Sequence, residues 1–399
     1  MDYTKITEHI REKFLQSELD GQLKDFLSSD CPVMIYGAGR QARLVIDFCN
    51  MFNKKLCALL TSGSTQRWGL LPREDELPLY TMGDLPEKIN LAEYDILLGV
   101  NSSLNEEIIP ALQAAGASHV YAPKDWNKEN DRIRYLFYRS YFEWHGADFH
   151  TDAEGEEILC YRKDDMDFRT YFPKDPLFRA NVLGEFGNIV LPALFHDERI
   201  CCLGPYEKEP YVLLKRGDIV LDLGASVGLF SCVAAAKGCT VYAFEPGNIP
   251  VYRFLSKNAD LYEEIHVMPF AVGEKNGVSP FYYNDNTERD MDLCRSSVHR
   301  HLDRSFRETQ VDMVTLDRFV EEHSIPRIDF IKSHIEYAEN YMLMGAQRIL
   351  RDSFPIFSAY SKKKLAGKDV EEVERLLREG NPGYHIEYEK RRVYAYRGE

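Results

Sequence analysis

The stretch Val220–Phe230, which reads VLDLGASVGLF, has the residue types and the spacing of a nucleotide-binding turn. An apolar run leads through an acidic residue into two glycines four positions apart, which predicts a tight turn from a strand into a helix. The first turn of that helix offers unpaired N–H groups and the positive end of the helix dipole, and both suit a carboxylate. The methionine part of S-adenosyl-L-methionine carries such a carboxylate. The residues expected to contribute are Asp222, Gly224, Ala225, Ser226 and Gly228.

A carboxylate follows at the end of the next expected strand, in the sequence AFEP. Glu245 lies 21 residues beyond Gly224, where it can accept hydrogen bonds from both hydroxyls of a ribose. The same arrangement would serve NAD, but the turn lacks the Gly-x-Gly that lies against a pyrophosphate. A sulfonium cofactor has no pyrophosphate, so we expect S-adenosyl-L-methionine. Further contacts are expected from Pro246 and, near the adenine, from Phe270 and Ala271.

Several further motifs accompany this turn in a fixed order. They are Gly204-Pro-Tyr-Glu207, Phe244-Glu-Pro246, Ala271-Val-Gly273, Thr315-Leu-Asp317, and Ile328-Asp-Phe-Ile-Lys332 with Glu336, Ala338 and Glu339. In order and spacing, residues 200–399 resemble the FkbM family of methyltransferases. The resemblance implies O-methylation, often of a sugar hydroxyl in an antibiotic, a lipopolysaccharide, a capsule or another surface glycan. The expected acceptor is therefore a sugar or glycolipid. Tyr206 and Glu207 lie just before the first core strand, where they form either part of a lid over the cofactor or an ordinarily packed connecting loop.

The reacting centre is expected at Lys332, His334 and Glu336, because ligands bind at the carboxyl ends of parallel strands. The family more often reads KIDVEGAE here, so His334 and Tyr337 depart from it, as does Ser361, where the family often has a histidine. Neighbouring strands lie about 4.8 Å apart, so we hypothesise that His334 supplies this imidazole from the adjacent strand. A neutral imidazole can accept the proton of an attacking hydroxyl, and Glu336 can orient it or bind a sugar hydroxyl.

A structural role for the same residues is the alternative. His334 would then only cap the strand, and Glu336 would pair with Lys332. Because two ligands are too few for a metal ion, no metal is predicted at this centre.

The N-terminal region shows a second strand, turn and helix. Pro32–Tyr36 is apolar and runs into GAGRQA, so Gly37, Gly39, Arg40 and, after the next strand, Ser62 are candidates for a nucleotide site. No acidic residue ends that next strand, which disfavours NAD. The region resembles the N-terminal sugar-nucleotide-binding domains of bacterial sugar acyltransferases, so a sugar nucleotide is the expected ligand. A domain without a ligand that mediates homodimer formation is equally compatible.

The alternation of strands and helices predicts an α/β protein with two Rossmann-like doubly wound domains. The C-terminal domain is expected to have the class I methyltransferase fold, with a mostly parallel seven-stranded sheet. Its expected elements include strands at 219–223 and 240–244 and one helix over 336–351. The expected boundaries are 1–123 for the first domain, 124–175 for a linking helix and connector, and 176–399 for the methyltransferase domain.

Composition limits the partners and the compartment. The net charge of −15 disfavours nucleic acid, which usually requires a basic surface. The nine cysteines are scattered without metal-binding spacing, which favours reduced thiols in the cytoplasm. No apolar run is long enough to predict a signal peptide or a transmembrane segment.

Two other functions fit the same sequence. The departures at His334, Tyr337 and Ser361 could mark a catalytically degenerate protein that only binds or regulates. In a weaker reading, the N-terminal domain is a nicotinamide oxidoreductase.

Overall fold

The structure is a computed structural model. It describes residues 3–63, 71–72, 76–87, 89–172, 176–247, 249–283, 307–336, 338–360 and 367–398.

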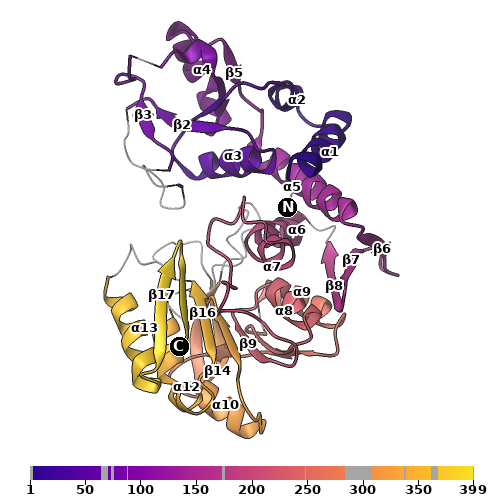
Figure 1. The fold of residues 1–399 in the computed structure, drawn as a ribbon, viewed down its shortest axis with the longest axis vertical. Helices are drawn as coiled ribbons and strands as arrows, with labels where there is room; N and C mark the ends of the chain where they lie inside the picture. The colour runs from indigo at the N-terminus through magenta and orange to yellow at the C-terminus, as the bar shows by residue number, and fades with distance from the viewer. Residues whose placement is uncertain are drawn as a thin grey trace. The chain divides into compact units, whose positions relative to one another are not determined.

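The chain divides into two compact units, Met1–Gly146 and Ala147–Glu399 (Figure 1). The boundary between the units falls inside the segment 124–175, which was expected to be a separate connector. Helix α5 (Trp126–Trp144) contacts α1 (Tyr3–Gln16) and α3 (Arg40–Met51) of the first unit. The remainder of the expected connector belongs to the second unit.

The first unit contains a parallel sheet of five strands in the order β3-β2-β1-β4-β5. The strands are β1 (Val33–Tyr36), β2 (Leu56–Thr61), β3 (Leu79–Thr81), β4 (Asp95–Leu98) and β5 (His119–Tyr121). The remaining helices are α2 (Gly21–Ser28), α4 (Asn105–Ala114) and the 3-10 turns η1 (Leu91–Glu93) and η2 (Ser102–Leu104). All residues of β1 and β4 are buried, as expected for a parallel sheet covered on both faces.

The second unit contains a seven-stranded sheet in the order β11-β10-β9-β15-β16-β18-β17. The strands are β9 (Ile219–Leu223), β10 (Thr240–Phe244), β11 (Ile265–Met268), β15 (Phe330–Ser333), β16 (Ile356–Tyr360), β17 (Tyr384–Glu389) and β18 (Arg392–Arg397). Neighbouring strands from β11 to β16 are parallel, whereas β18 is antiparallel to both of its neighbours. The predicted α/β class is confirmed, and the seven-stranded sheet is mixed because of β18.

Helices of the second unit follow the strands. They are α8 (Leu229–Ala236), α9 (Pro250–Ala259), α10 (Leu316–Glu322), α11 (Glu339–Met344), α12 (Gln347–Asp352) and α13 (Gly367–Gly380). The single helix expected over 336–351 is therefore two helices. The break lies at Gly345, where a Cβ atom would come within 2.2 Å of the Gly273 carbonyl oxygen. This close approach accounts for the glycine between the helices.

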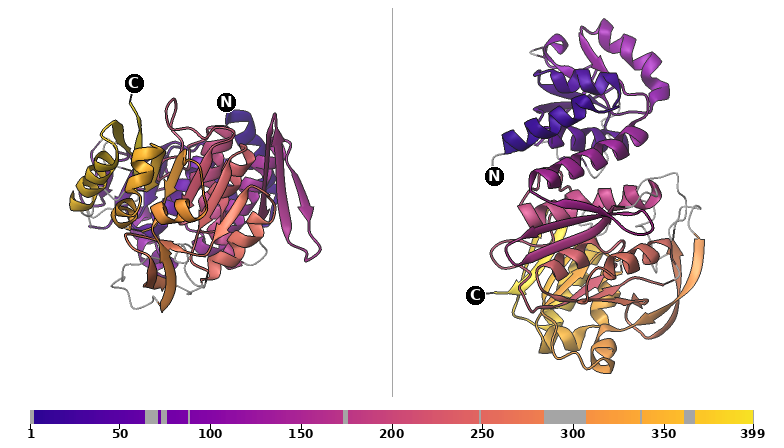
Figure 2. Two further views of the ribbon diagram at one scale, coloured as in Figure 1. Left: turned by 90° about the horizontal axis from the view of Figure 1, so that it is seen from below. Right: turned by 90° about the vertical axis from the view of Figure 1, so that its right-hand side faces the viewer.

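Two small sheets and a helical segment complete the second unit. One sheet is β6 (Asp148–Thr151), β7 (Glu157–Lys163) and β8 (Met166–Phe172), and Figure 2 shows it at an edge of this unit. The other is β12 (Ala271–Val272), β13 (Gly277–Tyr283) and β14 (Arg307–Val314). The segment α6 (Pro176–Glu185), η3 (Phe186–Val190) and α7 (Leu191–Phe195) precedes β9. Across the described residues, no helix combines the length and the apolar character needed to span a bilayer.

Candidate active site

The turn between β9 and α8 is held in left-handed backbone conformations. Gly224, Ser226 and Gly228 have φ values of +69°, +53° and +85°. A Cβ atom at Gly224 would lie 2.3 Å from the carbonyl oxygen of His334, and one at Gly228 would lie 2.8 Å from a side-chain carbon of Leu255. At Gly224 the backbone of His334 and the positive φ both require glycine, whereas at Gly228 the positive φ is the main reason, because the Leu255 side chain can shift.

Asp222 and Lys332 form a buried ion pair beneath this turn. The Lys332 Nζ lies 2.7 Å from Asp222 Oδ1 and donates to the Gly224 carbonyl at 2.8 Å. Ser231 donates to the other carboxylate oxygen at 2.6 Å. Burial opposes the charge of Lys332, but the ion pair with Asp222 leaves the pKa of the ammonium raised.

Asp222 is 0% exposed and Lys332 is 3% exposed, and both polar groups are bonded to the protein. Both residues hold the turn, and a contact of Asp222 with the cofactor or of Lys332 with the reacting atoms stays a prediction.

Glu245 lies directly after β10 and next to the turn. The Ser226 N–H donates to its Oε2 at 2.8 Å, and the residue is only 6% exposed. Burial raises the pKa of this carboxyl to about 7, although the Ser226 hydrogen bond and Lys332 act in the opposite direction. A buried carboxylate in this state is stabilised by additional hydrogen-bond donors, and the two hydroxyls of a ribose are such donors. The turn and Glu245 therefore fit S-adenosylmethionine.

The other expected cofactor contacts lie further along the chain. Pro246 is buried after Glu245, and Phe270 is half-buried and packs against the core of the sheet. Ala271 is 6% exposed and pairs with Met313 in the small sheet, so it offers a ligand little side-chain surface.

His334 is held after β15 by its backbone and is surrounded by polar groups. Its N–H donates to the Leu223 carbonyl at 3.0 Å. The ring Nδ1 lies 3.1 Å from the Tyr206 hydroxyl, and Nε2 lies 3.4 Å from Glu336 Oε1. Burial lowers the pKa of His334 in spite of Glu336, and the charges of Arg392 and Lys332 lower it further. The imidazole is therefore neutral at pH 7, as a proton acceptor must be.

Glu336 reaches His334 because the chain reverses between them. It has a left-handed backbone with φ of +46°, and its side chain is 9% exposed. Tyr337 and Ser361, the other two departures from the family pattern, lie outside the described residues. The structure thus brings His334 and Glu336 together and places the turn and Glu245 on the adjacent strand ends.

Residues 222–384 match the family model described as the methyltransferase FkbM domain. All of the matched residues lie in the second unit. The match includes the turn, Glu245, His334 and Glu336. No curated protein matches the chain.

Solved structures give weaker similarities. An FkbM methyltransferase of Methylobacillus flagellatus KT is 13% identical, with a TM-score of 0.38, over 99% of this chain and 99% of its own. A SAM-dependent methyltransferase of Aquifex aeolicus is 14% identical, with a TM-score of 0.27, over 46% of this chain and 84% of its own. A 16S rRNA methyltransferase of T. thermophilus, in complex with AdoMet and guanosine, is 15% identical, with a TM-score of 0.27, over 99% and 92%. These TM-scores are too low to support a statement about function.

Two further residues lie close to His334, and of these Arg392 was not expected there. Tyr206, expected in a lid or in a packed loop, is 4% exposed, and its ring lies 3.5 Å from the Arg392 guanidinium and 5.2 Å from the Phe230 ring. Arg392 is 1% exposed and donates to the Gly204 carbonyl at 2.9 Å. Tyr206 could be found from the sequence because it belongs to the motif Gly204-Pro-Tyr-Glu207. Arg392 could not, because it lies in a short basic run of the kind that is usually exposed to solvent.

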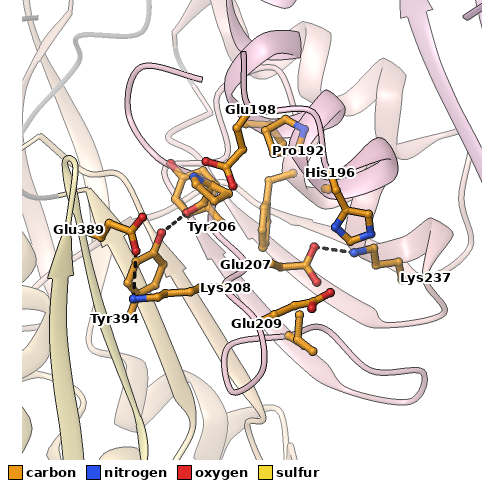
Figure 3. Close-up of a pocket in the computed structure, with 15 residues that line it drawn as sticks. Pro192, His196, Glu198, Tyr206, Glu207, Lys208, Glu209, Lys237, Glu389 and Tyr394 are labelled. Carbon is orange, nitrogen blue, oxygen red and sulfur yellow. Dashed lines mark hydrogen bonds and ion pairs between the residues drawn. The ribbon is translucent and has the colours of Figure 1, made fainter. Parts of the chain in front are cut away.

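Tyr206 also borders a cavity of about 260 Å³ (Figure 3). The cavity contains the Lys237–Glu207 ion pair, in which the two charged atoms are 2.5 Å apart. Among the described residues that line it there is neither a residue of the glycine turn nor Glu245 or His334. The cavity is therefore separate from the centre predicted for the FkbM domain, and Tyr206 is the residue that borders both.

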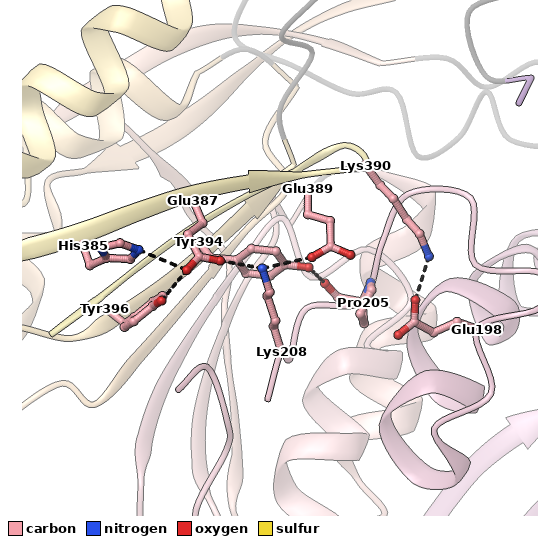
Figure 4. A network of polar contacts seen from close by, with 9 residues as sticks. All are labelled: Glu198, Pro205, Lys208, His385, Glu387, Glu389, Lys390, Tyr394 and Tyr396. Atoms are coloured by element: carbon pink, nitrogen blue, oxygen red, sulfur yellow. Dashed lines mark hydrogen bonds and ion pairs between the residues drawn. The ribbon is translucent and has the colours of Figure 1, made fainter. Parts of the chain in front are cut away.

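A network of polar contacts fixes the segment that carries Tyr206 against β17 and β18 (Figure 4). Lys208 pairs with Glu387 and with Glu389, the latter at 3.0 Å, and the hydrogen bond from Lys208 lowers the pKa of Glu387 to about 2. Tyr394 donates to the Pro205 carbonyl at 2.6 Å. These contacts fix Pro205, which precedes Tyr206, and Lys208, which follows it, and so they hold Tyr206 in place.

The glycine turn of the first unit has a packing role. Gly37 has φ of +134°, and a Cβ atom there would lie 2.5 Å from the Gly99 carbonyl oxygen. Gly39 is the N-cap of α3, and Ser62 is exposed after β2. Arg40 begins α3, and its side chain lies outside the described residues. The likeness to sugar acyltransferases is not confirmed, and the sugar nucleotide stays a prediction.

Proposed function

We propose that this protein is an S-adenosylmethionine-dependent methyltransferase that methylates a hydroxyl of a sugar, glycolipid or secondary metabolite. The observation that carries the proposal is the position of Glu245 beside the glycine turn. A buried carboxylate with a pKa of about 7 and an accepted Ser226 N–H lies where the ribose of a nucleoside can be bound. The N-terminus of α8 then faces the carboxylate of the methionine part.

The chemistry requires little activation by the protein. S-adenosylmethionine, if held by the glycine turn and Glu245, would supply an electrophilic methyl group, so that an oxygen–carbon bond could form in line as the carbon–sulfur bond breaks and S-adenosylhomocysteine leaves. The acceptor hydroxyl loses its proton to His334, whose lowered pKa keeps one ring nitrogen able to accept it. Rate acceleration then comes mainly from holding the hydroxyl and the methyl group in line.

Tyr206 orients this base, and Glu336 lies where it can bind a second hydroxyl of the acceptor. If the imidazole carries its hydrogen on Nδ1, it donates to the Tyr206 oxygen, and the lone pair of Nε2 faces the side of Glu336. An acceptor hydroxyl can then donate to Nε2 while Glu336 binds a neighbouring hydroxyl of the same sugar. Support for a sugar as the acceptor comes from the family resemblance and from this pair of acceptor groups.

The cofactor is tested by calorimetric titration with S-adenosylhomocysteine. Wild type is expected to bind, and Gly224→Val and Glu245→Ala are expected to bind at least tenfold more weakly. Because a side chain at Gly224 would contact the His334 carbonyl, each variant is first checked for folding by circular dichroism. Titrations with NADH and a UDP-sugar run in parallel and test the first unit. A folded wild type that does not bind S-adenosylhomocysteine would overturn the proposal.

A second candidate function is favoured by one observation. Both ring nitrogens of His334 already have polar neighbours, Tyr206 at 3.1 Å and Glu336 at 3.4 Å. A protein that binds the cofactor without turnover would have such a satisfied histidine. Binding of S-adenosylhomocysteine together with no methyl transfer to a panel of glycans would favour this function.

A further inference from the structure

Three side chains with metal-ligating atoms meet at the amino-terminal edge of the first unit's sheet. Cys31 precedes β1, Asp95 begins β4 and His119 begins β5. Strand β4 lies between the other two, and Asp95 is paired with Val33 on one side and with His119 on the other. A sulfur of Cys31, a carboxylate oxygen of Asp95 and a ring nitrogen of His119 all lie within 4.8 Å of one another.

Asp95 has few donors for a buried carboxylate. It is 0% exposed, and among the described residues neither of its oxygens accepts a hydrogen bond of full geometry. The Tyr121 hydroxyl and His119 Nδ1, at 3.5 Å from Oδ1, are the polar groups that approach it. Lys54, whose charge acts on Asp95, donates instead to the carbonyls of Phe26, at 2.9 Å, and Ser29. Burial of a carboxylate with so few donors is unfavourable, and a bound cation removes that cost.

The distances suit a tetrahedral metal ion. His119 Nδ1 lies 3.5 Å from Asp95 Oδ1. Nitrogen and oxygen ligands bonded to one tetrahedral zinc at about 2.0–2.2 Å are about 3.4 Å apart, so this pair already has the required spacing. A zinc–sulfur bond of about 2.3 Å places the sulfur about 3.6 Å from the other ligands, so Cys31 has to approach by at most about 1.2 Å. Cys31 is half-buried and lies before β1, outside the sheet.

We propose that Cys31, Asp95 and His119 bind one zinc ion, with water as the fourth ligand. A thiolate, a carboxylate and an imidazole are zinc ligands, whereas calcium and magnesium prefer oxygen alone. The side chain of His119 is 49% exposed, so the fourth position is open to solvent. The ion joins the beginnings of three adjacent strands and thereby stabilises the first unit. This proposal does not depend on methyl transfer by the second unit.

The test is a titration of the full-length protein after removal of metal with a chelator. Wild type is expected to bind one Zn²⁺ per chain, and Co²⁺ in its place is expected to give a thiolate-to-metal absorption band. Cys31→Ser is expected to lose that band, and Cys31→Ser and His119→Ala are each expected to bind Zn²⁺ at least tenfold more weakly. Cys57→Ser removes a half-buried thiol of β2 that is outside the cluster, and it is expected to bind as wild type does.

Unfolding of the first unit gives a second measurement. All three tryptophans, at positions 68, 126 and 144, belong to this unit, so their fluorescence reports its unfolding. Zn²⁺ is expected to raise the unfolding temperature of wild type by several degrees and to leave that of His119→Ala unchanged. No Zn²⁺ binding by wild type at micromolar concentration would overturn the proposal. Binding to both variants with wild-type affinity would also overturn it, because the ion would then lie elsewhere.

Discussion

Glu245→Gln is expected to stabilise the second unit at alkaline pH while it weakens cofactor binding. The glutamine has the same shape and can still accept the Ser226 N–H, so the change removes the charge and leaves the packing. The pKa of Glu245 is raised from 4.5 to about 7 because the carboxyl is buried. The folded protein therefore holds this proton more tightly than the unfolded chain does. The contribution of Glu245 to stability is fully present below about pH 4.5 and is lost as the pH rises through about 7.

The size of the effect follows from the shift in pKa. A shift of about 2.5 pH units corresponds to about 3.4 kcal/mol at high pH, and Glu245 is too deeply buried for solvent to screen much of it. Because part of this cost is already present at pH 5, the gain from Glu245→Gln should grow by about 2.5 kcal/mol between pH 5 and pH 8. For a unit of this size that difference corresponds to roughly 5–10 °C in Tm.

Differential scanning calorimetry at pH 5 and pH 8 measures this gain. The transition of the second unit is identified by its shift when S-adenosylhomocysteine is added to wild type. Glu263→Gln removes an exposed carboxylate of the same unit and should change Tm little at either pH. An equal gain from Glu245→Gln at both pH values would refute the reasoning, because the carboxyl would then have an ordinary pKa. Unchanged affinity for S-adenosylhomocysteine would show that Glu245 does not bind the ribose.

Four further outcomes are expected. On a proven acceptor, His334→Ala should lower kcat by about 10²–10⁴-fold, and unchanged turnover would remove the base assignment. The rate of the wild-type enzyme should fall as the pH is lowered, with a midpoint below pH 6.5, because the pKa of His334 is lowered from that value. A midpoint above pH 7 would contradict this. Tyr206→Phe should lower kcat by about tenfold with little change in KM, since it removes only the hydroxyl that orients the imidazole. Lys332→Met should destabilise the second unit by about 3–5 kcal/mol in denaturant titrations, because it leaves Asp222 buried without its cation.

The elements that could be predicted from the sequence are those with local signals. β9 and β10 have the bounds 219–223 and 240–244 that were expected, because each is an apolar run that ends in turn residues. The helix expected over 336–351 is broken at Gly345 by the approach of Gly273, which lies far away in the sequence. The spacing of apolar residues within 336–351 does not reveal such a long-range contact.

The site shows the same limit. Glu245 and the glycines could be predicted as a site because strand, turn and carboxylate follow one another within a single βαβ unit. The ion pair of Asp222 depends on Lys332, 110 residues later, and Tyr206 reaches His334 across 128 residues. Cys31 lies before β1, and Asp95 and His119 begin β4 and β5, so a search for local metal-binding spacing could not find the three together.

The cofactor turn and the reacting segment are packed as one structure, and this explains how His334 can stand where the family usually has another residue. The backbone N–H of His334 donates to Leu223, and its carbonyl oxygen occupies the space that a side chain at Gly224 would need. Lys332 fixes the same turn through the Gly224 carbonyl. At position 334 the turn is therefore supported by backbone atoms. Any residue except proline, which lacks the N–H, can supply these atoms. The side chain is left to vary with the chemistry, so an imidazole can be introduced here without loss of the cofactor site. Removing the imidazole by His334→Ala should accordingly leave the affinity for S-adenosylhomocysteine within about twofold of wild type, and a large loss of affinity would contradict this separation of roles.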